Sequence, residues 1–314
     1  MRLITAFLRL VRWPNLLFII LTQVMFEYCV LQPIFRHAGI HNNIQGVYFL
    51  LICFSYVLMG AAGYIINDYF DLNIDLVNKP GKVIVAKIIK RRWVLVWHII
   101  LNFLAIACNI YVDLHTSSKI AGITSFVCVI LLFFYSTTLK KKFLIGNVVV
   151  AAITAWSIIV LTWLEGSRFF QLYHRAANLD FEKIFRLTVL YTGFAFIISL
   201  IREVVKDMED VEGDRRYGCK TMPIVWGTMA TKVFVSVWFT VLIAVLIAIQ
   251  FYVMHFGWWI SIVYTVVLII TPLIKAFRLL FPARTPEDYH RLSSLIKLVM
   301  LTGILSMVFF LLYS

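Results

Sequence analysis

The sequence contains few charged residues, which make up 14% of its 314 residues, whereas 62% are hydrophobic. Soluble domains carry about 25% charged residues, so the composition excludes an ordinary soluble fold. Apolar runs of about 18 residues or more recur along the whole chain, and such runs indicate transmembrane helices. We therefore predict an integral membrane protein that is embedded in the lipid bilayer.

Cysteine is scarce as well, and its spacing carries no chemical pattern. The five cysteines are Cys29, Cys53, Cys108, Cys128 and Cys219. They form no CxxC pair and four lie inside apolar runs, so we interpret them as small core residues and not as metal ligands or disulfides. The N-terminus has basic residues but lacks a short apolar core with a cleavage site, so no removable signal peptide is expected.

Nine apolar segments are predicted to cross the membrane as helices. They are 14–34, 47–66, 93–112, 119–138, 145–164, 184–201, 233–254, 257–274 and 294–313. This pattern predicts an all-α, polytopic membrane protein with one transmembrane domain over residues 1–314. Two longer loops, at about 67–92 and 202–232, interrupt the series on one side of the membrane.

Acidic residues are the minority charge, with 16 Asp and Glu against 29 Lys and Arg and a net charge of +13. If the N-terminus is cytoplasmic, 23 of the 29 basic residues lie on segments that face the cytoplasm. The positive-inside rule therefore accounts for the charge, and no nucleic-acid partner is expected. We predict a bacterial or archaeal cytoplasmic membrane protein whose C-terminus is outside.

Two acidic triplets stand out, each directly after an apolar run, 47–66 or 187–201. They are Asp68, Asp71 and Asp75 in the first triplet, and Asp207, Asp210 and Asp214 in the second. Both have the spacing i, i+3, i+7, which places the side chains within about 60° of one another on a helix. The predicted topology brings both triplets to the cytoplasmic side of the membrane.

Carboxylates this close repel one another unless a cation lies among them, and oxygen ligands suit Mg²⁺ that is shared with substrate phosphates. Solvated helix ends would explain one triplet alone, but two in the same register favour a metal site. Asn67 adjoins the first triplet and Lys206 the second. Glu203 shares the second acidic face and is a candidate to support the metal or to bind substrate. Glu209 and Glu212 point away from that face and are expected at the surface.

Basic and polar residues near the triplets are candidates for phosphate contacts. They are Arg12, Asn15, Lys82, Lys140, Arg202 and Lys206. Topology alone also explains lysines on this side. Arg202 and Lys206 differ because they lie just inside a span, where a lone cation is costly, so either a bound polyanion or neighbouring carboxylates must compensate them.

The pattern Asn67-Asp68-x-x-Asp71-x-x-x-Asp75, together with Lys206-Asp207-x-x-Asp210-x-x-Gly213-Asp214, resembles the two signatures of the UbiA superfamily of intramembrane prenyltransferases. Arg12-Trp13-Pro14-Asn15 and Tyr135-Ser136…Lys140…Gly146-Asn147 resemble its weaker landmarks. The resemblance implies a helical bundle around a central cavity, two Mg²⁺ ions, and transfer of a prenyl group from an allylic prenyl diphosphate. It implies metal binding by the six aspartates and Asn67, and catalytic roles for Asp68, Asp71, Asp207, Asp210 and Lys206.

Residues 202–214 are most similar to the branch that prenylates geranylgeranylglycerol phosphate, which implies the hydroxyl of a prenylated glycerol phosphate as acceptor and ether lipid as product. Relatives that act on aromatic quinone precursors more often have Tyr where Arg202 stands, and an aromatic acceptor is the alternative. A divalent-cation or anion transporter is the rival of another class, but transport sites usually lie near the bilayer midplane. No obligatory protein partner is expected.

Overall fold

The computed structural model describes residues 2–39, 44–81, 83–116, 118–172 and 180–313. In these ranges the backbone is helical apart from connecting turns and loops, and Val85 forms an isolated bridge with Ile89. The all-α prediction is therefore confirmed.

Eight helical segments of the described chain are long and apolar enough to cross a membrane. They are Trp13–His37, Val47–Phe70, Arg91–His115, Ile145–Gly166, Phe181–Glu209, Gly227–Met254, Trp259–Leu280 and Pro286–Leu312. The predicted segment 119–138 falls on a shorter apolar helix, α7 (Ala121–Thr137). At 1.5 Å per residue, the 24 residues of α4 (Val47–Phe70) extend about 36 Å, which is sufficient for a hydrocarbon core of about 30 Å.

The helices group into two compact units. Unit 1 comprises Met1–Leu139 and Trp156–Thr188, and unit 2 comprises Lys140–Ala155 and Val189–Ser314. Helix α8 (Ile145–Leu172) contributes to both units. The first aspartate triplet belongs to unit 1 and the second to unit 2.

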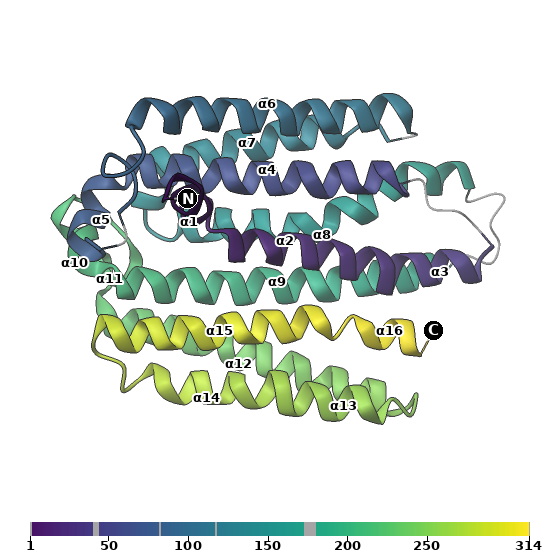
Figure 1. Ribbon diagram of the computed structural model, residues 1–314. Helices are drawn as coiled ribbons and strands as arrows, with labels where there is room; N and C mark the ends of the chain where they lie inside the picture. Colours follow the sequence, from purple (N-terminus) through teal and green to yellow (C-terminus); the bar gives the residue numbers. More distant parts are fainter. Residues whose placement is uncertain (1, 40–43, 82, 117, 173–179, 314) are drawn as a thin grey trace. The chain divides into compact units, whose positions relative to one another are not determined.

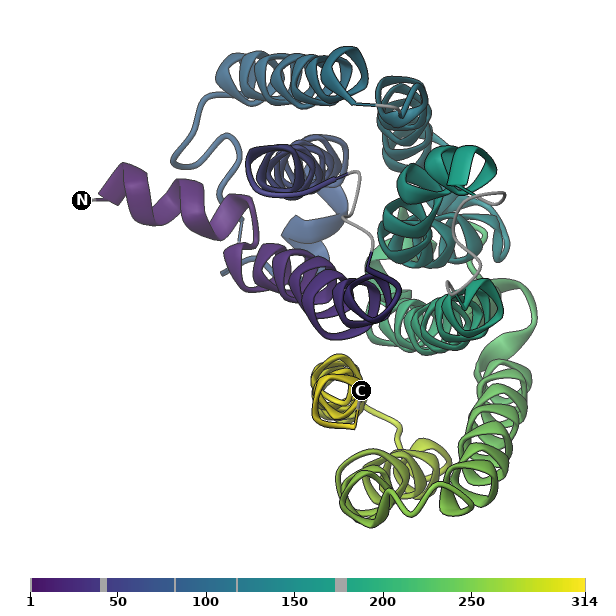
Figure 2. The same cartoon turned by 90° about the vertical axis from the view of Figure 1, so that its right-hand side faces the viewer.

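In unit 1, α4 is the helix against which α2 (Trp13–Phe26), α6 (Arg91–His115) and α7 pack (Figures 1 and 2). Two glycines make this possible, because small residues let membrane helices approach closely. A Cβ atom at Gly60 would lie 2.8 Å from Cδ1 of Ile19 on α2, and one at Gly63 would lie 3.4 Å from Leu132 on α7.

Polar side chains also join the helices of unit 1. The side-chain amide of Asn109 on α6 donates to Oγ of Ser55 on α4 at 2.7 Å and to Oγ of Ser125 on α7, and all three residues are buried. Hydrogen bonds of this kind stabilise helix pairs in lipid, where water is not available as a partner.

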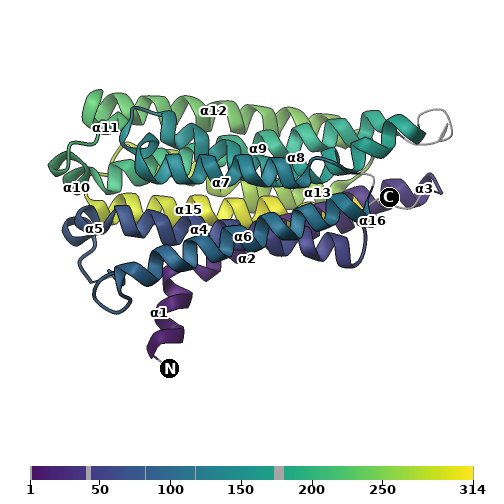
Figure 3. The ribbon, with the colours of Figure 1, turned by 90° about the horizontal axis from the view of Figure 1, so that it is seen from above.

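The N-terminal helix of unit 1, α1 (Arg2–Leu10), runs across the direction of α4 and α6 (Figure 3). Its Leu3 and Ile4 are 67% and 68% exposed, whereas Leu10 is fully buried. An amphipathic helix that leaves the bundle direction in this way suits the membrane–water interface.

Unit 2 contains the second half of the spans. Its core joins α9 (Phe181–Glu209), α12 (Gly227–Met254), α14 (Thr271–Leu280) and α15 (Pro286–Leu305), and includes the buried Phe239, Leu273 and Ile296. Helix α15 approaches α9 at Gly303, where a Cβ atom would overlap the ring of Phe194.

A π-helical turn, η3 (Val266–Ile270), lies between α13 (Trp259–Thr265) and α14. It precedes Pro272, which has no N–H to donate to the carbonyl oxygen of Leu268. The hydroxyl of Thr302 on α15 donates to that oxygen at 2.8 Å instead. The deviation from α-helix therefore leaves no unsatisfied carbonyl at Leu268.

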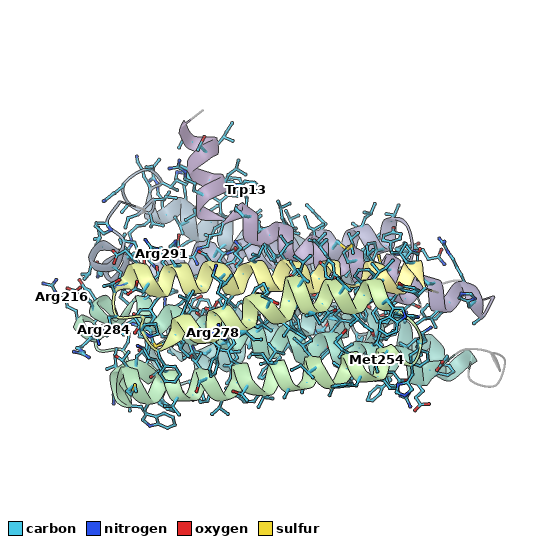
Figure 4. All side chains as sticks on the ribbon, turned by 90° about the horizontal axis from the view of Figure 1, so that it is seen from below. Trp13, Arg216, Met254, Arg278, Arg284 and Arg291 are labelled. Atoms are coloured by element: carbon cyan, nitrogen blue, oxygen red, sulfur yellow. The ribbon has the colours of Figure 1, made fainter. Side chains whose placement is uncertain are left out.

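Basic residues concentrate at one end of unit 2. Arg216, Arg284 and Arg291 lie at that end and Met254 at the opposite end (Figure 4). The second aspartate triplet is at the same end as these arginines, since Asp214 and Arg216 both belong to α10 (Val211–Arg216). This arrangement within unit 2 agrees with the predicted segregation of charge.

Candidate functional site

The first triplet is arranged around a bend between two helices. Helix α4 ends at Phe70, Asp71 has φ −85° and ψ −1°, and α5 (Leu72–Asn78) follows. The Asp71 N–H donates to the carbonyl oxygen of Asn67 at 2.9 Å, and the Asp75 N–H to that of Asp71 at 2.8 Å. Hydrogen bonding of the helical kind thus continues through the bend, and the three carboxylates stay one turn apart.

The second triplet has the same local structure. Helix α9 ends at Glu209, Asp210 has φ −101° and ψ 10°, and α10 follows. The Asp210 N–H donates to the carbonyl oxygen of Lys206 at 2.9 Å, and the Asp214 N–H to that of Asp210 at 3.2 Å.

Both middle aspartates therefore occupy the sparsely populated backbone region near ψ 0°, where many active-site residues lie. The sequence predicted a single helix face for each triplet. The structure shows instead that each face bends at its middle aspartate, Asp71 in unit 1 and Asp210 in unit 2. A pattern of charges at i, i+3 and i+7 does not reveal such a bend, because the helical hydrogen bonds persist across it.

Arg12 and Asn67 bond to the first triplet. Nη2 of Arg12 donates to Oδ1 of Asp68 at 2.8 Å, and the Asn67 amide donates to Oδ2 of Asp71 at 2.7 Å. The guanidinium carbon of Arg12 also lies 5.1 Å from the centre of the Tyr64 ring. Burial is the largest single effect and disfavours the charge on Arg12. The attractions of Asp68, Tyr64 and Asp75 and the hydrogen bond to Asp68 together outweigh it, so the pKa of Arg12 is raised and the group stays protonated.

Arg12 occupies this position through an unusual backbone conformation. It has φ 51° and ψ 52°, the left-handed region, and caps the N-terminus of α2 immediately before Trp13 and Pro14. Non-glycine residues are uncommon there. Pro14 suits the first turn of a helix because it needs no N–H partner, so α2 begins directly after Arg12.

In unit 2, Asn147 on α8 bonds to the second triplet. Its buried side-chain amide donates to Oδ2 of Asp207 at 2.8 Å. The sequence marked Asn147 only as a landmark. The polar side chain of Asn147 inside the apolar segment 145–164 was a signal in the sequence, but it does not indicate that Asp207 is its partner.

Glu203 compensates the two intramembrane cations of α9. Its carboxylate accepts from Nζ of Lys206 at 2.9 Å and from Nη1 of Arg202 at 3.2 Å. A neighbouring carboxylate, one of the two explanations offered for these cations, is present in the structure. The Nε atom of Arg202 is buried and has no hydrogen-bond partner among the described residues.

Two further predicted substrate-binding residues, Asn15 and Lys140, lie within the described part of the chain. Asn15 is on the first turn of α2, where its N–H donates to the carbonyl oxygen of Arg12 at 2.7 Å. Lys140 is half-buried in the 3₁₀ turn Leu139–Lys141 of unit 2, next to Lys141, whose carbonyl accepts from the Lys220 N–H at 2.8 Å. Lys82 lies outside the described residues.

The expectation that Glu209 is a surface residue is wrong. Its side chain is 8% exposed, and Oε1 lies 3.1 Å from Nδ1 of His290 on α15. The helix-face argument placed Glu209 off the acidic face correctly. It could not show that α15 packs against that other face.

The donors near each triplet are carboxylates and amides, a set that suits a hard cation such as Mg²⁺. Across the described residues, no group of three or more His, Cys, Asp or Glu side chains is arranged to hold a metal ion alone. Mg²⁺ is commonly bound by one or two carboxylates and completed by water and substrate phosphates. The residues present therefore fit Mg²⁺ that arrives with a diphosphate.

The fold and these residues define an all-helical integral membrane protein with two matched aspartate bends at helix ends. The model of the UbiA prenyltransferase family matches residues 35–301, and the chain belongs to that family. It is a membrane prenyltransferase with the UbiA-like fold.

The chain is similar to several named relatives. A digeranylgeranylglyceryl phosphate synthase of Methanosphaera stadtmanae is 31% identical over 248 residues, which cover 78% of this chain and 81% of that protein. Alignments with other such synthases are shorter, as little as 52% of the relative's length.

Solved structures share the fold. One described as concerning digeranylgeranylglyceryl phosphate synthase in membranes has a TM-score of 0.58 at 21% identity, and the match covers 98% of this chain and 99% of that one. A UbiA homologue from Archaeoglobus fulgidus, bound to DMAPP and Mg²⁺, has a TM-score of 0.61 at 15% identity, and covers 96% of this chain and 98% of that one.

Proposed function

We propose that this enzyme transfers a prenyl group from an allylic prenyl diphosphate to the free hydroxyl of a prenylated glycerol phosphate, which forms an ether lipid. The carrying observation is the pair of aspartate bends at Asp71 and Asp210, in a chain 31% identical to a digeranylgeranylglyceryl phosphate synthase over 248 residues. The acceptor assignment rests on that similarity and on the cations of α9.

Each triplet would bind Mg²⁺ through its carboxylates, with one ion per triplet and the substrate diphosphate completing the coordination. Bound Mg²⁺ would act as a Lewis acid that neutralises the diphosphate leaving group. In unit 1, Asn67 holds Asp71, and in unit 2, Asn147 holds Asp207, each through one amide hydrogen bond. These bonds orient the carboxylates toward a ligand before it binds.

Fixed cations would stabilise the charge that develops as the allylic C–O bond breaks. Lys206 is one turn from Asp210, whose N–H donates to the Lys206 carbonyl oxygen. Arg12 is already paired with Asp68. Preorganised charges of this kind stabilise a transition state without further rearrangement. Lys140 and Asn15 complete the proposed diphosphate contacts, together with Lys82.

The carbocation must be kept from water until the acceptor hydroxyl attacks. The apolar membrane-spanning helices would exclude water. After diphosphate has left, the acceptor oxygen would form the new C–O bond with the allylic cation, and the hydroxyl proton would pass to the released diphosphate. The chain acts as a single transmembrane domain in this proposal, with both triplets reached from the cytoplasm.

Mass spectrometry of reaction products tests the assignment. The purified protein in lipid nanodiscs would be given dimethylallyl, geranyl or geranylgeranyl diphosphate together with geranylgeranylglycerol phosphate, 4-hydroxybenzoate or dihydroxynaphthoate. We expect an ether lipid and released diphosphate, and loss of both on addition of EDTA with recovery by Mg²⁺. Prenylation of an aromatic acceptor with none of the glycerol phosphate lipid would overturn the acceptor assignment.

A further inference from the structure

Lys297 is a charged residue inside the last membrane span, Pro286–Leu312. The apolar part of this helix begins at about residue 294, so Lys297 lies about one turn inside it. A charge at such a depth is costly in hydrocarbon and marks a functional site by default.

Helices α9 and α15 run antiparallel and contact each other at Glu209–His290 and at Phe194–Gly303. This register places Arg202 on α9 level with the half-buried Lys297 on α15, where the two positive charges repel. Both residues belong to unit 2, where the two helices pack in one core. The Arg202 side chain is 17% exposed and donates to Glu203 through Nη1. Its Nε–H is buried and, within the described chain, donates to no acceptor.

Three cations surround one carboxylate at this pair. Glu203, whose side chain is 14% exposed, already accepts hydrogen bonds from both Arg202 and Lys206. Lys297 adds a third cation to the same neighbourhood. The next acidic residue along α9, Asp207, is bonded by Asn147 and belongs to the metal triplet.

The anion at this pair would differ from the diphosphate. Arg202 precedes Asp207 by five residues, which at about 100° per residue turns it about 140° around the helix, and moves it about 8 Å further into the membrane. A diphosphate held by Asp207 and Asp210 would therefore lie about 8 Å nearer the membrane surface than Arg202.

We propose that Arg202 and Lys297 bind the phosphate monoester of the acceptor lipid, and that Lys297 determines specificity for a phosphorylated acceptor. This inference rests on the proposed function. A phosphate monoester carries a charge of about −1.5 to −2 at pH 7, which one guanidinium and one ammonium group match. Arginine binds phosphate in two-point geometry, and lysine adds a point charge.

The test compares steady-state kinetics of the wild type, Lys297→Met and Lys297→Arg in nanodiscs of phosphatidylcholine. Each is given geranylgeranylglycerol phosphate and, separately, the same lipid without its phosphate. For Lys297→Met, we expect the KM for the phosphorylated acceptor to rise about tenfold or more, with the KM for the prenyl diphosphate unchanged. Preference for the phosphorylated over the neutral acceptor should fall, and Lys297→Arg should restore most of it.

Arg291→Met is the matched control, because Arg291 is an exposed cation on the same helix and lies near its cytoplasmic end. It should leave both KM values unchanged. If Lys297→Met does not fold, Lys297→Gln keeps a polar side chain of similar length and serves in its place. An unchanged preference for the phosphorylated acceptor in the folded variant would overturn the inference.

The source of the phosphate is distinguished by repeating the assay with phosphatidic acid in the nanodiscs. If the pair binds any lipid phosphate, phosphatidic acid will inhibit the wild type on the neutral acceptor, and this inhibition will be absent in Lys297→Met. That result would replace acceptor recognition with headgroup binding and overturn the inference. Failure of the wild type to prenylate any glycerol phosphate lipid would instead refute the proposed function.

Discussion

The buried side-chain amide of Asn147 on α8 donates to Oδ2 of Asp207 on α9 at 2.8 Å, across 60 positions of sequence. This bond fixes one carboxylate oxygen and leaves Oδ1 to accept another ligand. Partners of this kind orient metal-binding groups, and their loss typically costs 10–100-fold in metal affinity or activity.

We therefore predict that Asn147→Leu raises the Mg²⁺ concentration needed for half-maximal turnover by about 10–100-fold. A Mg²⁺ titration of turnover at saturating prenyl diphosphate measures this. Thr240→Val is the control, because the Thr240 hydroxyl is on an exposed face of α12 and donates to the Ser236 carbonyl one turn away. An unchanged Mg²⁺ requirement in Asn147→Leu would show that the bond does not support metal binding.

Both triplets should be required for turnover. Asp68→Asn and Asp207→Asn each remove a negative charge with little change in shape, and metal-assisted charge stabilisation is worth several kcal/mol, so we expect a loss of about 100-fold or more. Turnover is measured by released diphosphate, after size-exclusion chromatography has shown that the variants are intact.

Glu212→Gln is the matched control for these variants, because Glu212 is an exposed acidic residue on α10, next to the second triplet. It should retain near-normal turnover. Near-normal turnover in either aspartate variant would contradict a role for that triplet.

The backbone of Arg12 makes a separate prediction about stability. Arg12→Ala and Arg12→Gly both remove the ion pair to Asp68, but only glycine adopts the left-handed conformation without steric cost. Because that conformation costs other residues roughly 1–2 kcal/mol, the glycine variant should be more stable than the alanine variant by about 1 kcal/mol.

Thermal unfolding in detergent compares the two variants. Ala244→Gly is the control in which glycine should lower the stability, since Ala244 is exposed within α12 and has an ordinary helical backbone. Glycine should destabilise the helix there. If Arg12→Gly unfolds at a lower temperature than Arg12→Ala, the prediction from the left-handed conformation is contradicted.

The sidedness of the first triplet can be measured directly. Asn73 is exposed next to Asp71, and His115 is exposed at the far end of α6 in the same unit. A membrane-impermeant thiol reagent should label Asn73→Cys in inverted vesicles and His115→Cys in right-side-out vesicles, because the positive-inside rule predicts that the basic loops face the cytoplasm. Wild-type protein provides the background from its own cysteines, and labelling with the opposite sidedness would reverse the proposed topology.

The sequence alone determined the class of fold. Hydropathy and helical period are properties of neighbouring residues, so the predicted spans fall on helices in the described chain, and both triplets lie at helix ends. The acidic spacing also placed Glu203 near the second triplet and identified two cations that needed compensation. Pro272 lies within the predicted apolar segment 257–274. The sequence does not indicate that Thr302, 30 residues later, satisfies the carbonyl of Leu268 in the π-helical turn.

Tertiary structure decided the partners of the site residues. Arg12 pairs with Asp68 across 56 positions, Asn147 with Asp207 across 60, and Glu209 with His290 across 81. Each pair depends on which helix faces pack together, and helical periodicity specifies only which residues share a face. Close packing at small residues such as Gly60 and Gly303 sets these contacts, because between membrane helices van der Waals fit and hydrogen bonds replace the hydrophobic effect as the driving force.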